Sequence, residues 1–99
     1  MKVEILYFDG GPTYQATHET LAEVLSDEGL EAEVELVAVN TDEEARWLRF
    51  PGSPTIRVDG RDPFPVPEKD DWRLGCRVYA TPEGLRGTPT ADMIRAALG

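Results

Sequence analysis

Apolar and polar residues recur with different periods along this chain, and these periods predict four strands. Residues 3–8 are nearly all apolar with β-branched and aromatic side chains, which is typical of a strand buried on both faces of a sheet. Residues 32–39 alternate at first and then become continuously apolar, which predicts a second strand. Residues 55–58 and 76–80 predict two further short strands.

Helical patterns separate the strands. The Gly-Gly-Pro run at 10–12 ends the first strand, and its proline suits the first position of a helix that continues to a stop at Gly29. Thr41 and Glu44 have the spacing of a capping box, which predicts a short second helix. The Thr-Pro pair at 88–89 opens the last helix.

The order of these elements predicts the architecture. A strand, helix and strand in succession make two parallel strands with a right-handed crossover, and a hairpin then adds two antiparallel strands. We therefore expect one α/β domain over residues 1–99, with a four-stranded mixed sheet (βαβα-ββα) flanked by helices. Residues 61–75, rich in proline and acidic residues, predict an Ω-loop or a lid between the third and fourth strands.

Composition narrows the class of protein. The chain has 99 residues, 40% of them hydrophobic, which suits one folded domain rather than a disordered segment. Its 19 acidic and 10 basic residues give a net charge of −9, which disfavours nucleic acid and anionic membranes as partners. No apolar run approaches the roughly 20 residues of a membrane span, and no signal-peptide pattern follows the N-terminus, so we expect a cytoplasmic protein.

Few residues have the chemistry of a metal or catalytic site. Cys76 is the single cysteine, so no intrachain disulfide forms, and with His18 it cannot make a structural metal site; we expect neither metal nor cofactor. His18 borders the apolar face of the first helix and is expected to be partly buried and hydrogen-bonded. Trp47 and Trp72 are candidate contact residues, and Trp47 is expected to be exposed.

Three short motifs carry a resemblance to a known family. They are FDGGPTY at residues 8–14, GSPTI at 52–56 and CRVY at 76–79. Together they resemble the thioredoxin-like superfamily, and in particular a subgroup of small bacterial thioredoxin-like proteins with D-G-C-P, F-x-G-S-P-T-I-x-x-D-G and C-R-x-Y motifs. Some members of that subgroup are labelled glutaredoxin-like or alkylmercury lyase-like.

The resemblance implies a thioredoxin-like fold and an altered active site. In that family a nucleophilic cysteine precedes the helix-opening proline, where the helix N-terminus favours its thiolate. A cis-proline faces this cysteine, and the backbone beside it pairs with an extended substrate. In this chain Gly11 stands at the nucleophile's position before Pro12, and Ser53-Pro54 stands at the cis-proline position.

Three functions remain open at this point. The preferred one is a redox-inactive domain that binds an extended peptide or a partner protein. The second is a thiol-disulfide oxidoreductase inactivated by a natural or engineered change at Gly11, and the third is a thiol or heavy-metal handling protein acting through Cys76. The residues expected to form the binding groove are Gly11, Pro12, Tyr14, Ser53 and Pro54.

Cys76 is expected to lie far from this groove. If the fourth strand returns antiparallel to the third, its first residue lies at the end opposite Pro54, and five strand residues span roughly 16 Å. That separation exceeds the ~7 Å between Cα atoms that a disulfide allows. We therefore expect Cys76 to be a buried, structural residue, with a reactive thiol as the alternative.

Overall fold

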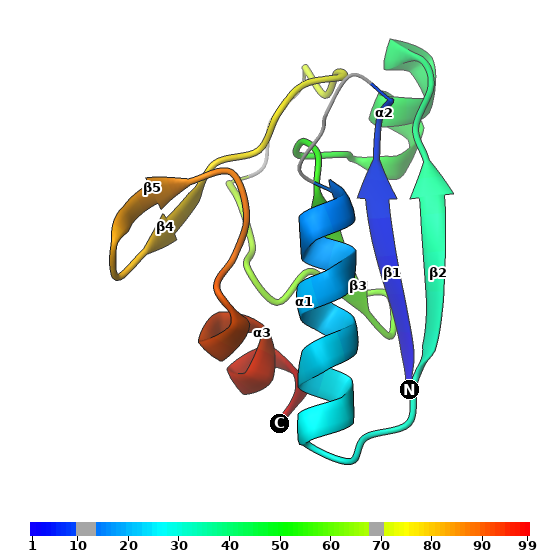
Figure 1. Cartoon of the computed structure of the whole chain (residues 1–99). Helices are drawn as coiled ribbons and strands as arrows, with labels where there is room; N and C mark the ends of the chain where they lie inside the picture. Colours follow the sequence, from blue (N-terminus) through cyan, green and yellow to red (C-terminus); the bar gives the residue numbers. More distant parts are fainter. Residues whose placement is uncertain (10–13, 68–70) are drawn as a thin grey trace.

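A three-stranded mixed sheet in the order β2-β1-β3 forms the centre of the molecule (Figure 1). β1 (Lys2–Tyr7) pairs in parallel with β2 (Glu33–Ala38) and antiparallel with β3 (Thr55–Val58). The computed structural model describes residues 1–9, 14–67 and 71–99. The mixed α/β class and the first three strands predicted from the sequence are confirmed.

Three helices flank this sheet. α1 (Tyr14–Asp27) connects β1 to β2, α2 (Asp42–Leu48) connects β2 to β3, and α3 (Ala91–Leu98) is the last element. In Figure 1, α1 runs alongside β1 and in front of β3, α3 lies beside the C-terminal half of α1, and α2 lies at the opposite end of the molecule. α1 and α3 pack against each other.

Side-chain caps set where the shorter helices begin. The Thr41 hydroxyl accepts a 3.0 Å hydrogen bond from the Glu44 amide, which confirms the predicted cap of α2. The Thr90 hydroxyl accepts one of 3.1 Å from the Met93 amide, so α3 begins after Thr90 rather than at residues 88–89. Thr90 can act as the N-cap because its backbone is extended and its hydroxyl reaches the Met93 amide. A helix that began at Pro89 would leave this hydroxyl without its capping role.

Alternation along β1 divides the core in two. Val3 and Ile5 are fully buried and pack with Leu21 of α1 and Ile94 of α3. Leu6 points to the other face, where it joins a smaller cluster of four buried residues, which are Leu6, Val39, Ala45 and Phe50. Because successive strand residues face opposite sides of a sheet, β1 is buried on both faces, as its apolar sequence predicts.

The expected fourth strand of the sheet is absent from the described part of the chain, and the four-stranded prediction is wrong there. β4 (Tyr79–Thr81) pairs antiparallel with β5 (Gly84–Arg86) as a separate hairpin that extends away from the body on the side opposite β2 (Figure 1). The turn between them consists of Pro82 and Glu83 and leads into Gly84, the first residue of β5, which has φ +104°. Through this turn β4 pairs with the strand that follows it, β5, and not with β3.

Across the described ranges, no helix combines the length and apolar character that a membrane span requires.

Candidate functional site

The predicted groove residues that the structure describes lie at one end of the sheet. Leu6, near the end of β1, is paired with Thr55 at the start of β3, so Ser53 and Pro54 lie at the end to which β1 runs. Tyr14 begins α1 near the same end, where its ring stacks on that of Tyr7 with centroids 4.1 Å apart. The Ser53–Pro54 peptide bond is cis, which confirms that prediction. Gly11 and Pro12 lie outside the described residues.

The backbone of Ser53 is already paired within the chain. Its N–H donates a 2.8 Å hydrogen bond to the Gly75 carbonyl, and its carbonyl accepts one of 3.0 Å from the Arg77 N–H. These two bonds make a parallel bridge between Ser53 and Cys76. The groups that were expected to bind an extended partner are therefore satisfied by residues 75–77 of the chain itself.

Gly52 permits this close approach. A Cβ atom on Gly52 would lie 2.8 Å from the Arg77 backbone nitrogen and 2.9 Å from its Cα, distances that real Cβ atoms do not adopt. Gly52 also has φ +128°, a conformation that favours glycine. The glycine of the GSPTI motif is thus required where segment 75–77 passes over it.

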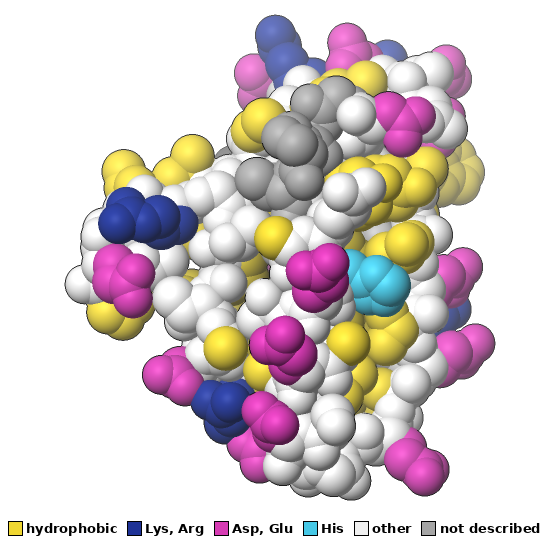
Figure 2. Space-filling model, in the orientation of Figure 1, with side chains coloured by type: hydrophobic (Ala, Val, Ile, Leu, Met, Phe, Trp, Pro, Cys, Tyr) yellow, Lys and Arg dark blue, Asp and Glu magenta, His cyan; other side chains and the backbone are white. Residues whose placement is uncertain are grey.

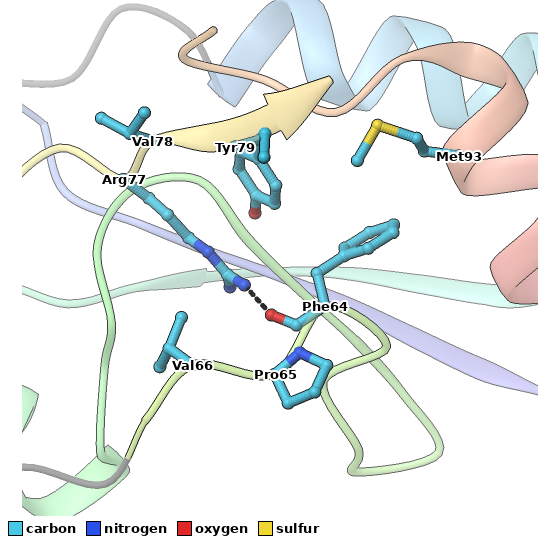
Figure 3. Close-up of a pocket in the computed structure, with 8 residues that line it drawn as sticks. Phe64, Pro65, Val66, Arg77, Val78, Tyr79 and Met93 are labelled. Carbon is cyan, nitrogen blue, oxygen red and sulfur yellow. Dashed lines mark hydrogen bonds between the residues drawn. The ribbon is translucent and has the colours of Figure 1, made fainter. Parts of the chain in front are cut away.

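The buried Arg77 side chain connects residues 75–77 to residues 62–64. Only 4% of it is exposed, and its Nη1 donates to the Asp62 carboxylate at 2.6 Å. Its Nη2 donates to the Phe64 carbonyl, the bond drawn in Figure 3. A charge this deeply buried is tolerated because it is paired and hydrogen-bonded, so Arg77 ties residues 62–64 and 75–77 into one unit.

Tyr79 completes the unit on the other side of the cis-proline. Its hydroxyl donates a 2.5 Å hydrogen bond to the Pro54 carbonyl, and only 3% of the residue is exposed. Its ring lies 4.5 Å from the Arg77 guanidinium carbon and meets Phe64 edge-on. Burial raises the pKa of the Tyr79 hydroxyl well above its ordinary value, and Arg77 opposes part of that rise. The tyrosine is therefore a hydrogen-bond donor at neutral pH.

Cys76 lies elsewhere than the sequence predicted. It sits opposite Ser53 in the bridge, beside the cis-proline, and it is a free, exposed cysteine. The prediction of a buried Cys76 at the far end is wrong because it assumed that residues 76–80 run antiparallel to β3. Residues 75–77 instead pass Ser53 in the parallel direction, with Arg77 turned inward and Cys76 outward.

An apolar hollow of about 250 Å³ opens between the hairpin, residues 64–66 and α3 (Figure 3). It is lined by Phe64, Pro65, Val66, Arg77, Val78, Tyr79, Ala80 and Met93. Two of these lining residues are exposed, Val66 by 37% and Val78 by 62%. Leu85 on β5, which is paired with the lining residue Ala80, is 70% exposed. We call the hollow together with Val66, Val78 and Leu85 the hairpin surface.

Sequence reasoning missed the hairpin surface, although a signal was present. The Pro-Glu-Gly run at 82–84, flanked by short β-prone segments, is a turn pattern that predicts a local hairpin. The sequence pattern instead predicts that residues 76–80 form the fourth strand of the central sheet, next to β3. The exposure of Val78 and Leu85 follows from the separation of the hairpin from that sheet.

The other candidate residues have varied positions. Trp47 is 86% exposed on α2, as predicted, whereas Trp72 is buried and so is not a surface contact residue. His18 is half-buried, as predicted, but no hydrogen-bond partner for it is found in the described part of the chain. In residues 1–9, 14–67 and 71–99, no group of three metal-ligating side chains comes together.

The charged side chains are unevenly distributed on the molecule. Figure 2 shows acidic side chains scattered over the face that contains α1, while the hairpin has apolar side chains beside one arginine and one glutamate, Arg86 and Glu83. A search of protein-family models, curated proteins and solved structures finds no match to this chain.

Proposed function

We propose that the chain is a redox-inactive thioredoxin-like domain that binds a protein or peptide through the hairpin surface. The observation that carries this proposal is the pairing of Ser53 with residues 75–77, since it fills the backbone position expected to receive a partner. An apolar hollow with exposed Val78 and Leu85 beside it lies open nearby. Binding there requires no thiol.

The dimensions of the hollow favour a side chain as its occupant. Sites for drug-sized molecules and cofactors usually enclose about 300–1,000 Å³. At about 250 Å³ the hollow is smaller and suits one or two apolar side chains of a partner. Exposed apolar residues that gather around such a hollow are typical of protein interaction sites.

Selection from a library of random peptides displayed on phage tests this proposal. We expect selected peptides to share an apolar residue and to lose at least tenfold in affinity for the Val78→Asp variant. Leu36→Asp is the matched control, because Leu36 is also an exposed apolar strand residue, 42% exposed, but lies on β2. Peptides that bind both variants like the wild type would overturn the proposal.

The exposure of Cys76 favours a second candidate function, in thiol handling. Its thiolate would attack one sulfur of a small-molecule or protein disulfide, form a mixed disulfide with that sulfur and release the other sulfur as a thiolate. The backbone bonds of Ser53 to the neighbours of Cys76 would hold the sulfur in place while it reacts. An oxidoreductase inactivated at Gly11 remains the alternative that concerns the residues outside the described ranges.

Alkylation of Cys76 separates a reactive thiol from a hidden one. Since Cys76 is exposed, we expect iodoacetamide to label the native protein within about tenfold of the rate in denaturant. The backbone hydrogen bonds of Ser53 to residues 75 and 77 do not involve the exposed thiol. Labelling should therefore leave the far-UV circular dichroism spectrum unchanged. Labelling a hundredfold slower than in denaturant would show that the thiol is shielded and would remove the second candidate.

A further inference from the structure

We propose that the partner of the hairpin surface is an extended segment with alternating apolar and acidic residues, which adds as a strand to the outer edge of β5. This inference rests on the proposed function and specifies its partner. It follows from three properties of the hairpin: a free edge, two chemically different faces and an arginine without a carboxylate partner.

The edge of β5 is open to a partner except at the Leu85 carbonyl, which accepts a hydrogen bond from the Arg86 side chain and would exchange it for a partner N–H. Within the described residues, β5 is hydrogen-bonded as a strand to β4 alone, and all three of its residues are exposed. Figure 1 shows the hairpin standing away from the central sheet, so no other element covers this edge in that view. An unpaired strand edge presents N–H and carbonyl groups that an incoming extended chain can bond.

Register gives the two faces of the hairpin different chemistry. Ala80 is paired with Leu85, and Tyr79 with Arg86. Directly opposite residues share a face, and successive residues alternate between faces. Leu85 and Ala80 therefore form an exposed apolar face, while Arg86 shares the opposite face with Tyr79. Both Ala80 and Tyr79 reach the hollow, so it adjoins both faces of β4.

Arg86 brings an unneutralised charge to the second face. Its Nη1 donates only to the carbonyl of Leu85, at 2.9 Å, and no described carboxylate lies within ion-pair distance of it. The other arginine of the hairpin region, Arg77, is buried and paired with Asp62. In a chain with 19 acidic residues, an exposed arginine of this kind is free to receive a carboxylate from a partner.

A strand added beside β5 would match both faces at once. Its side chains would alternate between the Leu85 face, where apolar residues bury surface, and the Arg86 face, where a carboxylate forms an ion pair. The backbone would supply the affinity common to all extended segments, and the alternation would supply selectivity. The partner is thus defined by a period of two residues, apolar then acidic.

Three synthetic octapeptides test this inference. The first alternates valine and aspartate, the second alternates valine and lysine, and the third is the first with every backbone nitrogen methylated, so that neither of its edges can donate strand hydrogen bonds. Binding to the full chain is followed by amide chemical shifts at about 0.15 M salt. There the Debye length is about 8 Å, so general attraction of lysine to the acidic surface is largely screened.

We expect the aspartate peptide to shift the amides of β4 and β5, and to bind at least tenfold more tightly than the other two. Arg86→Glu should reverse the preference toward the lysine peptide, and Arg86→Gln should abolish it. Arg73→Glu is the matched control, because Arg73 is an exposed arginine outside the hairpin, and it should change affinity less than twofold.

Two results would overturn the inference. Equal binding of the aspartate and lysine peptides at the hairpin would exclude selection by Arg86, and equal binding of the N-methylated peptide would exclude strand addition. If none of these peptides binds while library-selected peptides still depend on Val78, the inference fails and the proposed function stands. If the library also yields no Val78-dependent peptide, both fail.

Discussion

Arg77 contacts four residues from different parts of the candidate site, which are Ser53, Asp62, Phe64 and Tyr79. Its guanidinium contacts the Asp62 carboxylate, the Phe64 carbonyl and the Tyr79 ring, and its backbone N–H bonds Ser53. These contacts connect the cis-proline loop, the loop at 62–64 and the start of the hairpin. The pairing of the Ser53 backbone therefore goes together with the burial of Arg77, whose two Nη atoms are hydrogen-bonded while its buried Nε has no partner among the described residues.

Gly52 is the residue on which this packing depends sterically. Gly52→Ala should destabilise the fold because its Cβ would overlap the Arg77 backbone and because φ +128° disfavours alanine. Gly29→Ala is the control, since Gly29 has φ +62° but nothing within 4 Å of its added Cβ. We expect Gly52→Ala to lose about 1–3 kcal/mol more than the control in urea unfolding. Equal losses would mean that the two segments do not touch.

Tyr79 makes the free energy of unfolding decrease at alkaline pH. Burial raises the pKa of its hydroxyl above the ordinary value, which is about 10, so the native state keeps a proton that the unfolded chain releases. The stabilisation linked to that proton is complete below about pH 10 and is lost as the pH rises beyond it.

Tyr79→Phe tests this linkage. At pH 7 the variant should lose about 1–3 kcal/mol of unfolding free energy, because the buried Pro54 carbonyl loses its donor. Between about pH 9.5 and 11 its stability should fall less steeply than that of the wild type. Urea unfolding across this range measures both; parallel pH dependences would show that the Tyr79 hydroxyl is not buried in solution.

At the scale of elements, the sequence predicts those parts of the fold that carry strong local patterns. The first three strands and the cap of α2 were identified because apolar runs and capping residues act locally. The fourth strand was misplaced, since residues 76–78 have a β-prone sequence but their path is fixed by the burial of Arg77. Periodicity treats an arginine as a surface residue and cannot foresee such a buried cation.

The candidate site was likewise predicted in part. The motifs identified Ser53, Pro54 and Cys76, and the structure brings these three residues together. Their relation was predicted wrongly, because the direction in which segment 75–77 passes Ser53 depends on long-range bonds that a linear pattern does not contain. The hairpin surface arises from the same cause, since it exists only where β4 leaves the central sheet.

At the scale of the whole molecule, two surfaces are candidates for the binding site. One is the cis-proline loop, where the chain pairs with itself, and the other is the hairpin surface, which is apolar and open. The net charge of −9 favours neither surface directly, but the hairpin, which has one arginine and one glutamate among apolar residues, differs from the acidic face that contains α1 (Figure 2). We propose that a partner binds at the hairpin surface.

Amide hydrogen exchange, measured with and without a library-selected peptide, tests this claim most directly. We expect the amides of Ser53 and Arg77 to exchange within about tenfold of the core amide of Ile5, because both are hydrogen-bonded inside the fold. Added peptide should protect the amides of β5 and leave Ser53 and Arg77 unchanged. Fast exchange at Ser53 and Arg77 in the free protein, with protection of Ser53 when peptide binds, would contradict the account and return the site to the cis-proline loop.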